Sequence, residues 1–222
     1  MRVEPDIQTA KPESTTSFRI ATQKLGKRFN RDWIFRDLSF TFQSGTVYAI
    51  TGPNGSGKST LMQILWGQMP QTTGTIQYFQ GTSPIELESL YRHVAMAAPY
   101  MDLIDEFTLE EQLRFHFRLR KCRDNMDVPQ LLEALDMKKS SDKYVGNFSS
   151  GMKQRVKLGL ALLTEAEAVF LDEPGTNLDE KAFAWYLELL KNVPANVVIF
   201  IASNQPREYP ADAIRLDLTA FK

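Results

Sequence analysis

The segment that most constrains the fold is GPNGSGKST at positions 52–60, which follows directly on the apolar run TVYAI. Glycine weakens a strand and costs conformational entropy on folding, so three glycines beside a short apolar strand need a specific reason. The segment fits the pattern G-x-x-x-x-G-K-[ST]. Behind it, the apolar spacing of STLMQILWGQM predicts a helix. The order is therefore buried strand, glycine loop and helix.

This loop has the composition of a phosphate-binding loop (P-loop). Without side chains in the way, its backbone N–H groups can turn inward as a concave anion nest, and the following helix adds its positive N-terminal end. We expect Lys58 to bridge the terminal phosphates, Ser59 to ligate Mg²⁺ and Thr60 to reach a phosphate oxygen. A chance glycine turn is the alternative, which the flanking strand and helix disfavour. The whole loop is assigned to the site: Gly52, Pro53, Asn54, Gly55, Ser56, Gly57, Lys58, Ser59 and Thr60.

A second stretch, AVFLDEP at 168–174, places two adjacent carboxylates at the end of a short apolar strand. Open parallel sheets bind ligands at the carboxyl ends of their strands. Asp172 is then expected to hold Mg²⁺. Glu173 is expected to polarise the attacking water, because the strand ends there and its side chain can turn into the site. Taken alone, the pair also fits a surface acidic turn.

A third stretch indicates a family. NFSSGMKQRVKLGLAL lies just upstream of the acidic strand and resembles the signature of ATP-binding cassette ATPases, usually written LSGGQ, with residues 148–152 at its five positions. Small residues at a helix N-terminus predict a second anion nest, although they also fit an ordinary helix cap. The P-loop, the signature, the acidic strand and GTNLD at 175–179, which resembles the D-loop, follow one another in the cassette order. The resemblance covers nearly the whole chain from about Phe18.

The resemblance implies a head-to-tail dimer, in which the P-loop of one chain holds ATP against the signature of the other. It assigns Ser149, Ser150, Gly151 and Asp179 to the nucleotide site. It also places Phe29 where family members stack an aromatic ring on adenine, with a core aromatic at a strand end as the alternative. ATP and Mg²⁺ are the implied cofactors.

Two positions depart from the family pattern. The Q-loop glutamine of the family, which contacts Mg²⁺ and relays to the membrane partner, aligns with Pro99, whose side chain has no ligand atom. The switch histidine of the family aligns with Asn204. Asparagine can hydrogen-bond near the γ-phosphate, but it cannot carry a proton. We therefore expect the hydrolysis machinery to carry over only in part, with Glu173, Lys58 and Asn204 as its catalytic groups.

The order of elements predicts an α/β fold, and the resemblance implies the P-loop NTPase class and the ATP-binding cassette ATPase fold. Short apolar strands alternating with helices favour a mostly parallel core sheet, with an N-terminal antiparallel β part and a helical subdomain. Thr108 with Glu111, and Asp127 with Gln130, have the spacing of helix capping boxes. The expected parts are a flexible tail at 1–17, a nucleotide-binding core at 18–84 and 164–222, and a helical subdomain at 85–163 that ends in the signature helix.

The composition limits the classes of partner that the chain is expected to bind. The 26 basic and 27 acidic residues give a formal charge of −1, which offers no footprint for nucleic acid. The single cysteine, Cys122, suits a reducing compartment, and no stretch approaches the roughly 20 apolar residues that span a bilayer. We expect a cytoplasmic chain, attached to the inner face of the membrane through a membrane-spanning transporter subunit. A second ATP-binding subunit, identical or not, is the expected dimer partner, and no nucleic acid is expected.

The leading interpretation is the ATP-binding subunit of a transporter, which binds and hydrolyses MgATP to drive a separate membrane-spanning subunit. A short cassette resembles exporter-type subunits more than sugar importers. Because of Pro99 and Asn204, a low-turnover nucleotide switch or the degenerate half of a heterodimer is the alternative. A soluble cassette of the translation or DNA-repair kind is a third reading, but the tandem cassettes or long coiled coils usual there are not visible in 222 residues.

Overall fold

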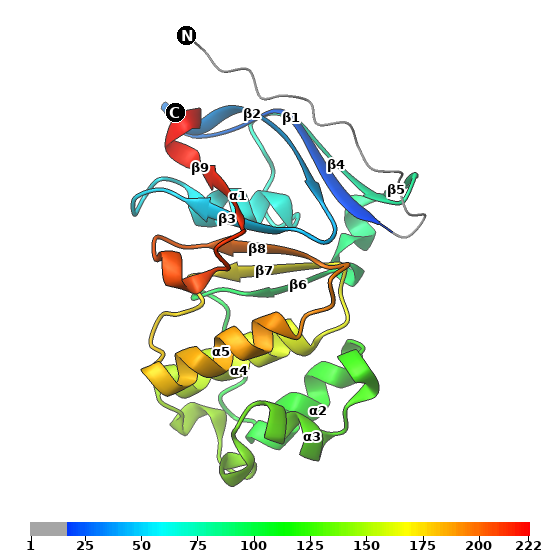
Figure 1. Cartoon of the computed structure of the whole chain (residues 1–222), viewed down its shortest axis with the longest axis vertical. Helices are drawn as coiled ribbons and strands as arrows, with labels where there is room; N and C mark the ends of the chain where they lie inside the picture. The colour runs from blue at the N-terminus through cyan, green and yellow to red at the C-terminus, as the bar shows by residue number, and fades with distance from the viewer. Residues whose placement is uncertain (1–16) are drawn as a thin grey trace.

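The structure is a computed structural model that describes residues 17–222. The tail expected at 1–17 therefore lies, apart from Ser17, outside the described residues. Figure 1 shows layers stacked along the long axis: an antiparallel sheet, a short helix, a parallel sheet, long helices and a second helical layer. This layering is the α/β architecture that the sequence predicts.

The antiparallel sheet has the strand order β2-β1-β4-β5. Leu38 and Phe42 on the second strand are buried. Phe42 packs edge-on against Phe200 of the parallel sheet, with the ring centroids 5.0 Å apart, so apolar side chains connect the two sheets. The strands are β1 (Phe18–Phe29), β2 (Asp32–Gln43), β4 (Thr73–Gln80) and β5 (Ser83–Ile85).

The second sheet has the order β6-β7-β8-β3-β9, and its neighbouring strands are parallel. Its strands are β3 (Val47–Thr51), β6 (Val94–Ala97), β7 (Ala168–Asp172), β8 (Val198–Ala202) and β9 (Ile214–Asp217). Every residue of β7 and β8 is buried, because other layers cover both faces of the sheet. The predicted strand in AVFLDEP is thereby confirmed.

The helices follow the predicted pattern at their starts. Thr108 accepts a hydrogen bond from the N–H of Glu111, and Asp127 accepts one from the N–H of Gln130, so both capping boxes are present. The α-helices are α1 (Lys58–Leu65), α2 (Leu109–Leu119), α3 (Val128–Ala134), α4 (Ser150–Leu163) and α5 (Glu180–Lys191). Short 3-10 helices lie between them: η1 (Leu87–Arg92), η2 (Arg123–Asn125), η3 (Lys138–Ser140), η4 (Val145–Asn147), η5 (Pro206–Glu208) and η6 (Leu218–Phe221).

Sequence and structure differ mainly at short elements. β6 lies inside the segment 85–163 and pairs with β7, so this strand joins the core sheet and the helical part begins after Ala97. The division into core and helical subdomain stays a prediction with that shift. α1 ends at Leu65, before the expected end of the apolar helical pattern, because Gly67 adopts φ of +84° in the turn that follows. β9, with four residues, is too short for a periodic signal.

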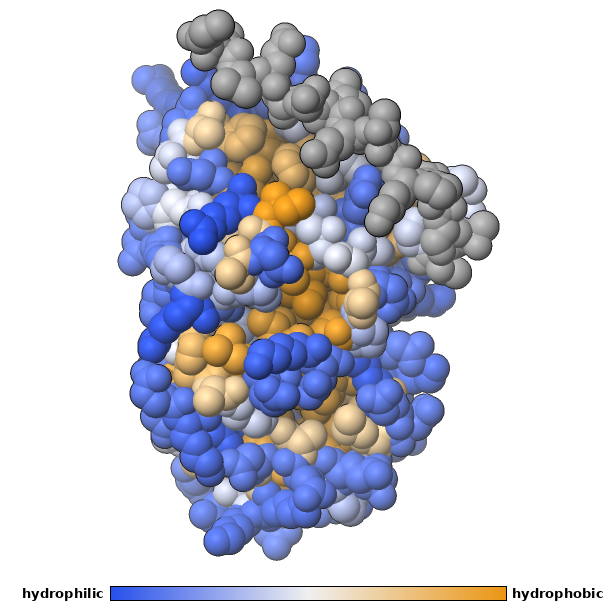
Figure 2. Space-filling model, viewed as in Figure 1, coloured by the Kyte–Doolittle hydropathy of each residue, from blue (hydrophilic) through white to orange (hydrophobic). Residues whose placement is uncertain are grey.

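The buried residues follow the layers. One cluster lies around α1 and between the sheets, a second between the parallel sheet and α4 and α5, and a third within the helical part. Figure 2 shows apolar side chains reaching the surface across the middle of this face, with polar side chains over the end that carries α2 and α3. Within residues 17–222, no helix combines the length and the hydropathy needed to cross a bilayer. The P-loop, the acidic pair and Asn204 all follow strands of the parallel sheet.

Candidate nucleotide-binding site

The P-loop connects β3 to α1 through a backbone that favours glycine. The φ angle is +139° at Gly52, +77° at Gly55 and +103° at Gly57, all in the left-handed region. A Cβ on Gly57 would also collide with the side chain of Ile34 on β2. The three glycines therefore allow the loop to adopt a fixed conformation that passes close to the antiparallel sheet.

Lys58 lies within this loop, with 5% of its surface exposed. Its Nζ donates to the carbonyl oxygen of Gly52 at 2.9 Å and to that of Pro53 at 3.3 Å. Among residues 17–222 it forms no ion pair, although the Asp172 carboxylate is near enough to interact with its charge. A buried ammonium held only by carbonyl oxygens keeps its charge available for an anion in the loop.

A hollow of about 210 Å³ opens beside the loop, and Glu173 at the end of β7 forms part of its wall. The φ angle of Glu173 is +48°, which turns the chain at the end of the strand, and its N–H donates to the carbonyl oxygen of Ala202 at 2.9 Å. The structure thus brings Glu173 and the P-loop to one hollow. The other lining residues are Ile34, Asn54, Gly55, Gly57, Lys58, Ser59 and Thr60.

Asp172 is the buried member of the acidic pair, with 1% of its surface exposed. Among the residues that the structure describes, neither carboxylate oxygen has a hydrogen-bond partner of good geometry. Burial raises the pKa of Asp172, while the neighbouring Ser59 hydroxyl and Lys58 ammonium oppose that rise. A buried, unsatisfied carboxylate next to a serine hydroxyl offers the oxygen ligands that Mg²⁺ prefers. The donor set therefore fits the metal that the sequence predicts.

Asn204 leaves the end of β8 and reaches the P-loop. Its Nδ2 donates to Oδ1 of Asn54 at 2.6 Å. The preceding residue, Ser203, is buried, and its N–H donates to the carbonyl oxygen of Ile50 in β3 at 3.1 Å. The position of the family's switch histidine thus lies at the P-loop, but with an amide in place of an imidazole that could carry a proton.

The signature forms a separate site at the N-terminus of α4. Ser149 caps this helix by accepting a hydrogen bond from the N–H three residues on, at 3.3 Å, and Ser150 is exposed. Gly151 lies against the D-loop, because a Cβ there would be 2.7 Å from the carbonyl oxygen of Asn177. Asp179 caps α5 by accepting from the N–H three residues on, at 2.7 Å. Both caps hold helix starts that face the same hollow.

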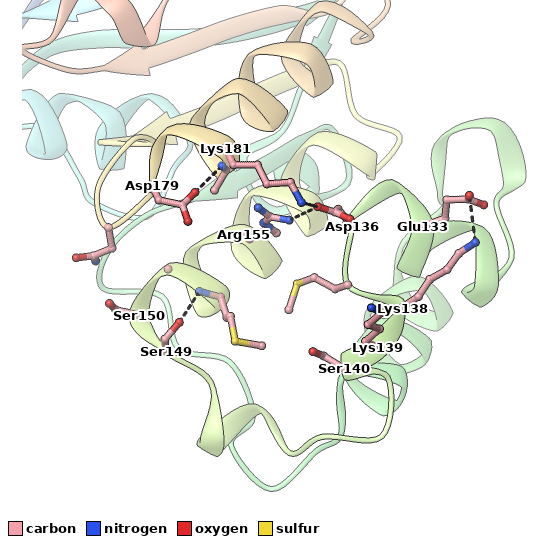
Figure 3. Close-up of a pocket in the computed structure, with 15 residues that line it drawn as sticks. Glu133, Asp136, Lys138, Lys139, Ser140, Ser149, Ser150, Arg155, Asp179 and Lys181 are labelled. Carbon is pink, nitrogen blue, oxygen red and sulfur yellow. Dashed lines mark hydrogen bonds and ion pairs between the residues drawn. The ribbon is translucent and has the colours of Figure 1, made fainter.

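Figure 3 shows these residues around a hollow of about 850 Å³ between the starts of α4 and α5 and the segment after α3. Its walls carry both charges: Arg155 pairs with Asp136 at 3.2 Å, and Lys181 pairs with the same carboxylate at 2.9 Å. No residue that lines the hollow beside the P-loop also lines this one. Within one chain, the P-loop and the signature are therefore two distinct sites.

Phe29 ends β1 and is 45% exposed, so the alternative that it is a core aromatic is wrong. The Nζ of Lys27 lies 5.1 Å from the centre of its ring. Phe29 is not among the residues that line the hollow beside the P-loop. Its stacking on adenine stays a prediction.

Pro99 follows β6, and its carbonyl oxygen accepts a hydrogen bond from Nζ of Lys157 on α4 at 3.1 Å. Burial lowers the pKa of Lys157. The segment at the Q-loop position is thus tied to the signature helix through main-chain oxygen rather than through a glutamine side chain. Sequence reasoning missed both Lys157 and the buried Glu208 on η5, because each is defined by contacts with residues distant in the chain.

Comparison with known proteins places this geometry in context. The family described as "ABC transporter" matches residues 35–176, which include the P-loop, the signature and the acidic strand. The chain is 29% identical over 194 residues to Nod factor export ATP-binding protein I of Rhizobium meliloti, covering 86% of this chain and 58% of that protein. The corresponding protein of Burkholderia lata is 33% identical over 176 residues, covering 78% and 58%.

A relative named for import is also similar. The sulfate/thiosulfate import ATP-binding protein CysA of Salmonella typhi is 33% identical over 167 residues, covering 72% of this chain and 46% of that protein. The chain therefore spans between about half and three fifths of the length of these relatives.

Solved structures agree on the fold. A Pyrococcus furiosus chain assigned as an ABC transporter ATP-binding protein superimposes with a TM-score of 0.76 at 19% identity, covering 91% of this chain and 98% of that chain. At that identity the likeness concerns the fold alone. An ATP-binding subunit of an ABC transporter superimposes with a TM-score of 0.72 at 27% identity, covering 83% and 79%.

Proposed function

This chain belongs to the ABC transporter family, whose ATP-binding proteins are ATPases, and on that premise we propose that it binds and hydrolyses MgATP to drive a separate membrane-spanning subunit. The observation that carries the proposal is the hollow that Glu173 shares with Lys58 and the rest of the P-loop. A phosphate cradle, a place for Mg²⁺ and a carboxylate that can position water are the parts that phosphoryl transfer to water requires.

In the proposed reaction, the P-loop N–H groups and Lys58 bind the β- and γ-phosphates. Ser59 and Asp172 hold Mg²⁺, which when bound supplies charge neutralisation to the phosphate oxygens. Glu173 orients the attacking water and accepts its proton. Asn204 contributes hydrogen bonding only, and its contact with Asn54 keeps it beside the loop.

We also propose that two ATP-binding subunits assemble head to tail. Ser150 and Gly151 lie at an accessible helix N-terminus, in a hollow separate from the chain's own P-loop. Such a helix start can receive the phosphates of a nucleotide that the other subunit has already bound. Asp179 lies at the same hollow, and Phe29 would stack on the adenine of its own chain.

The proposed membrane partner works in the direction of export. The relatives named for export align over up to 86% of this chain, against 72% for the relative named for import. Through that partner, the chain is proposed to sit at the cytoplasmic face of the membrane.

ATP turnover by the purified chain tests the proposal, with Glu173→Gln as the decisive variant. This change keeps the size of the side chain but removes the base, so kcat should fall at least about 100-fold. ATP affinity should stay within about threefold, and an ATP-bound dimer should accumulate on size exclusion. Glu188→Gln, on the exposed side of α5, is the matched control and should leave kcat unchanged. If wild type hydrolyses ATP well above background and Glu173→Gln does so equally fast, Glu173 is not the base.

A low-turnover nucleotide switch is the second candidate. It is favoured by the amide at Asn204, which reaches the P-loop without a group that can take a proton, and by the lack of a side-chain ligand at Pro99. A switch of this kind would bind ATP and dimerise, yet hydrolyse little. A wild-type kcat as low as that of Glu173→Gln, with ATP-driven dimerisation intact, would favour the switch over the ATPase.

A further inference from the structure

Glu208 is a buried carboxylate that the proposed reaction does not use. It is the last residue of η5, between β8 and β9, and 1% of its surface is exposed. Its Oε2 has no hydrogen-bond partner within the described part of the chain. Burying a carboxylate costs free energy even when the group is partly hydrogen-bonded, so its position requires an explanation.

The other carboxylate oxygen, Oε1, packs against the D-loop. It fills the space that a Cβ on Gly175 would take, so only glycine allows this approach. Burial raises the pKa of Glu208, and the neighbouring Ser203 hydroxyl and Gly175 N–H oppose that rise. Glu173 adds to the rise through its charge. The carboxylate therefore stands between the segment that follows β7 and the segment that follows β8.

The backbone of Glu208 is held independently of its side chain. The hydroxyl of Tyr186 on α5 donates to the carbonyl oxygen of Glu208 at 2.8 Å, and the N–H of Glu208 donates to the carbonyl oxygen of Gln205 at 3.0 Å. Tyr186 is itself completely buried. The backbone of Glu208 is thus held by α5 and by Gln205, while its carboxylate lies beside Gly175.

Both strand-end segments carry groups that meet the nucleotide site. Glu173 begins the segment after β7, and Asn204 in the segment after β8 contacts Asn54 of the P-loop at 2.6 Å. The first segment also meets the signature helix, because Nε2 of Gln154 donates to the carbonyl oxygen of Pro174 at 3.0 Å. Glu208 therefore lies where the P-loop side and the signature side of the molecule join.

We propose that Glu208 is a positioning residue for ATP hydrolysis, holding Gly175 of the D-loop and Ser203 at a fixed separation. In this position Glu173 stays in the wall of the hollow beside the P-loop, and Asn204 stays in contact with Asn54. This inference rests on the proposed ATPase function. An apolar side chain could fill the same space without the cost of burying a charge. Binding of ATP to the P-loop does not need this alignment, whereas the geometry of the attacking water does.

Steady-state kinetics of Glu208→Ala and Glu208→Gln test this role. Glu208→Ala should lower kcat about 20-fold with ATP affinity within about threefold, because misalignment affects the transition state more than the P-loop. Glu208→Gln keeps one acceptor oxygen and should lower kcat about fivefold, as should Ser203→Ala. Tyr186→Phe is the matched control. It removes only the contact with the backbone of Glu208, and should lower the melting temperature without lowering kcat.

Amide hydrogen exchange of the nucleotide-free chain separates this inference from the ATPase proposal. Exchange at 173–177 and 202–205 should be faster in both Glu208 variants and unchanged in Tyr186→Phe. If neither wild type nor Glu173→Gln hydrolyses ATP above background, the ATPase proposal fails, and exchange alone still decides whether Glu208 holds the two segments. If both Glu208→Gln and Glu208→Ala show the same exchange rates and the same kcat as wild type, the inference is overturned. A Glu208→Gln variant that loses ATP affinity, kcat and thermal stability together would also overturn it.

Discussion

The two helix starts that we propose as anion-binding sites are built differently. The P-loop leaves a buried strand, and its Lys58 is almost completely enclosed. The signature follows an irregular segment, and Ser149 and Ser150 are both exposed at its helix start. The first nest can surround phosphates within a single chain, whereas the second presents an open face. The proposed phosphate cradle at the P-loop is thus complete within one chain, while the proposed second nest lies open.

Charge separates the two sites in the same way. Lys58 forms no ion pair with any residue in 17–222, while Arg155 and Lys181 at the signature hollow both pair with Asp136. Hydrogen bonds from Lys181 and Arg155 hold the pKa of Asp136 below its usual value. Both pairs reduce the positive charge that an anion would meet, and the exposed pair of Lys181 with Asp136 contributes little stability. The chain's own affinity for nucleotide should therefore lie in the P-loop.

The largest expected effect follows from Lys58→Ala. Removing the one ammonium inside the P-loop should weaken ATP binding at least about 100-fold, or ~2.7 kcal/mol, with the fold intact. Calorimetric titration measures the affinity, and circular dichroism checks the fold. Lys139→Ala, in the wall of the signature hollow, is the control and should bind ATP as wild type does. A comparable loss of ATP affinity in Lys58→Ala and Lys139→Ala would mean that the P-loop and the signature hollow do not differ in nucleotide binding.

Ser150→Arg should act on dimerisation instead. An arginine at this helix start places bulk in the nest meant for the other subunit's nucleotide, so the ATP-dependent dimer should weaken at least about tenfold. The monomer should still bind ATP, because its P-loop is untouched. Size exclusion of the Glu173→Gln background with MgATP measures the dimer. Ser83→Arg on β5, at the far end of the molecule, is the control (Figure 1). An equal dimer yield in both variants would mean that Ser150 is only part of the helix start and has no role in dimerisation.

A smaller effect is expected from Asn204→His. An imidazole at this position can carry a proton and a charge near the γ-phosphate, so kcat should rise about threefold while ATP affinity changes less. Turnover and titration of the same preparations measure both quantities. The 2.6 Å contact of Asn204 with Asn54 gives the opposing case, in which the larger ring disturbs the P-loop. A fall in kcat would show that the chain has adapted to asparagine.

The smallest effect is expected from Pro99→Gln. The contact of this segment with Lys157 uses the main-chain oxygen, which glutamine retains, so turnover of the isolated subunit should change less than about twofold. Lys157→Met removes that contact and should have the larger effect on kcat. A strong gain of turnover in Pro99→Gln alone would mean that the missing side chain limits hydrolysis even without a membrane partner.

The sequence by itself was enough for features whose physical cause is local. The φ angles that favour Gly55 and Gly57 belong to single residues, and the capping box of Thr108 with Glu111 closes within one turn. A strand such as β7 is buried along its whole length, so a continuous apolar run was sufficient to locate it. These local patterns indicate the P-loop, the acidic pair and the signature helix from the order of the residues alone.

Only the tertiary structure decided which of these features meet. The hydrogen bond from Asn204 joins it to a residue 150 positions earlier, and the Glu208 carboxylate fills the space beside Gly175 on another strand end. β6 was missed because its place beside β7 is not visible in its own four residues. The parallel sheet sets neighbours by packing strands that are not consecutive in the chain, in the order β6-β7-β8-β3-β9. Contacts created by that order leave no periodic signal in the sequence. They are fixed by the burial of the complete sheet, and no single strand carries that information in its own residues.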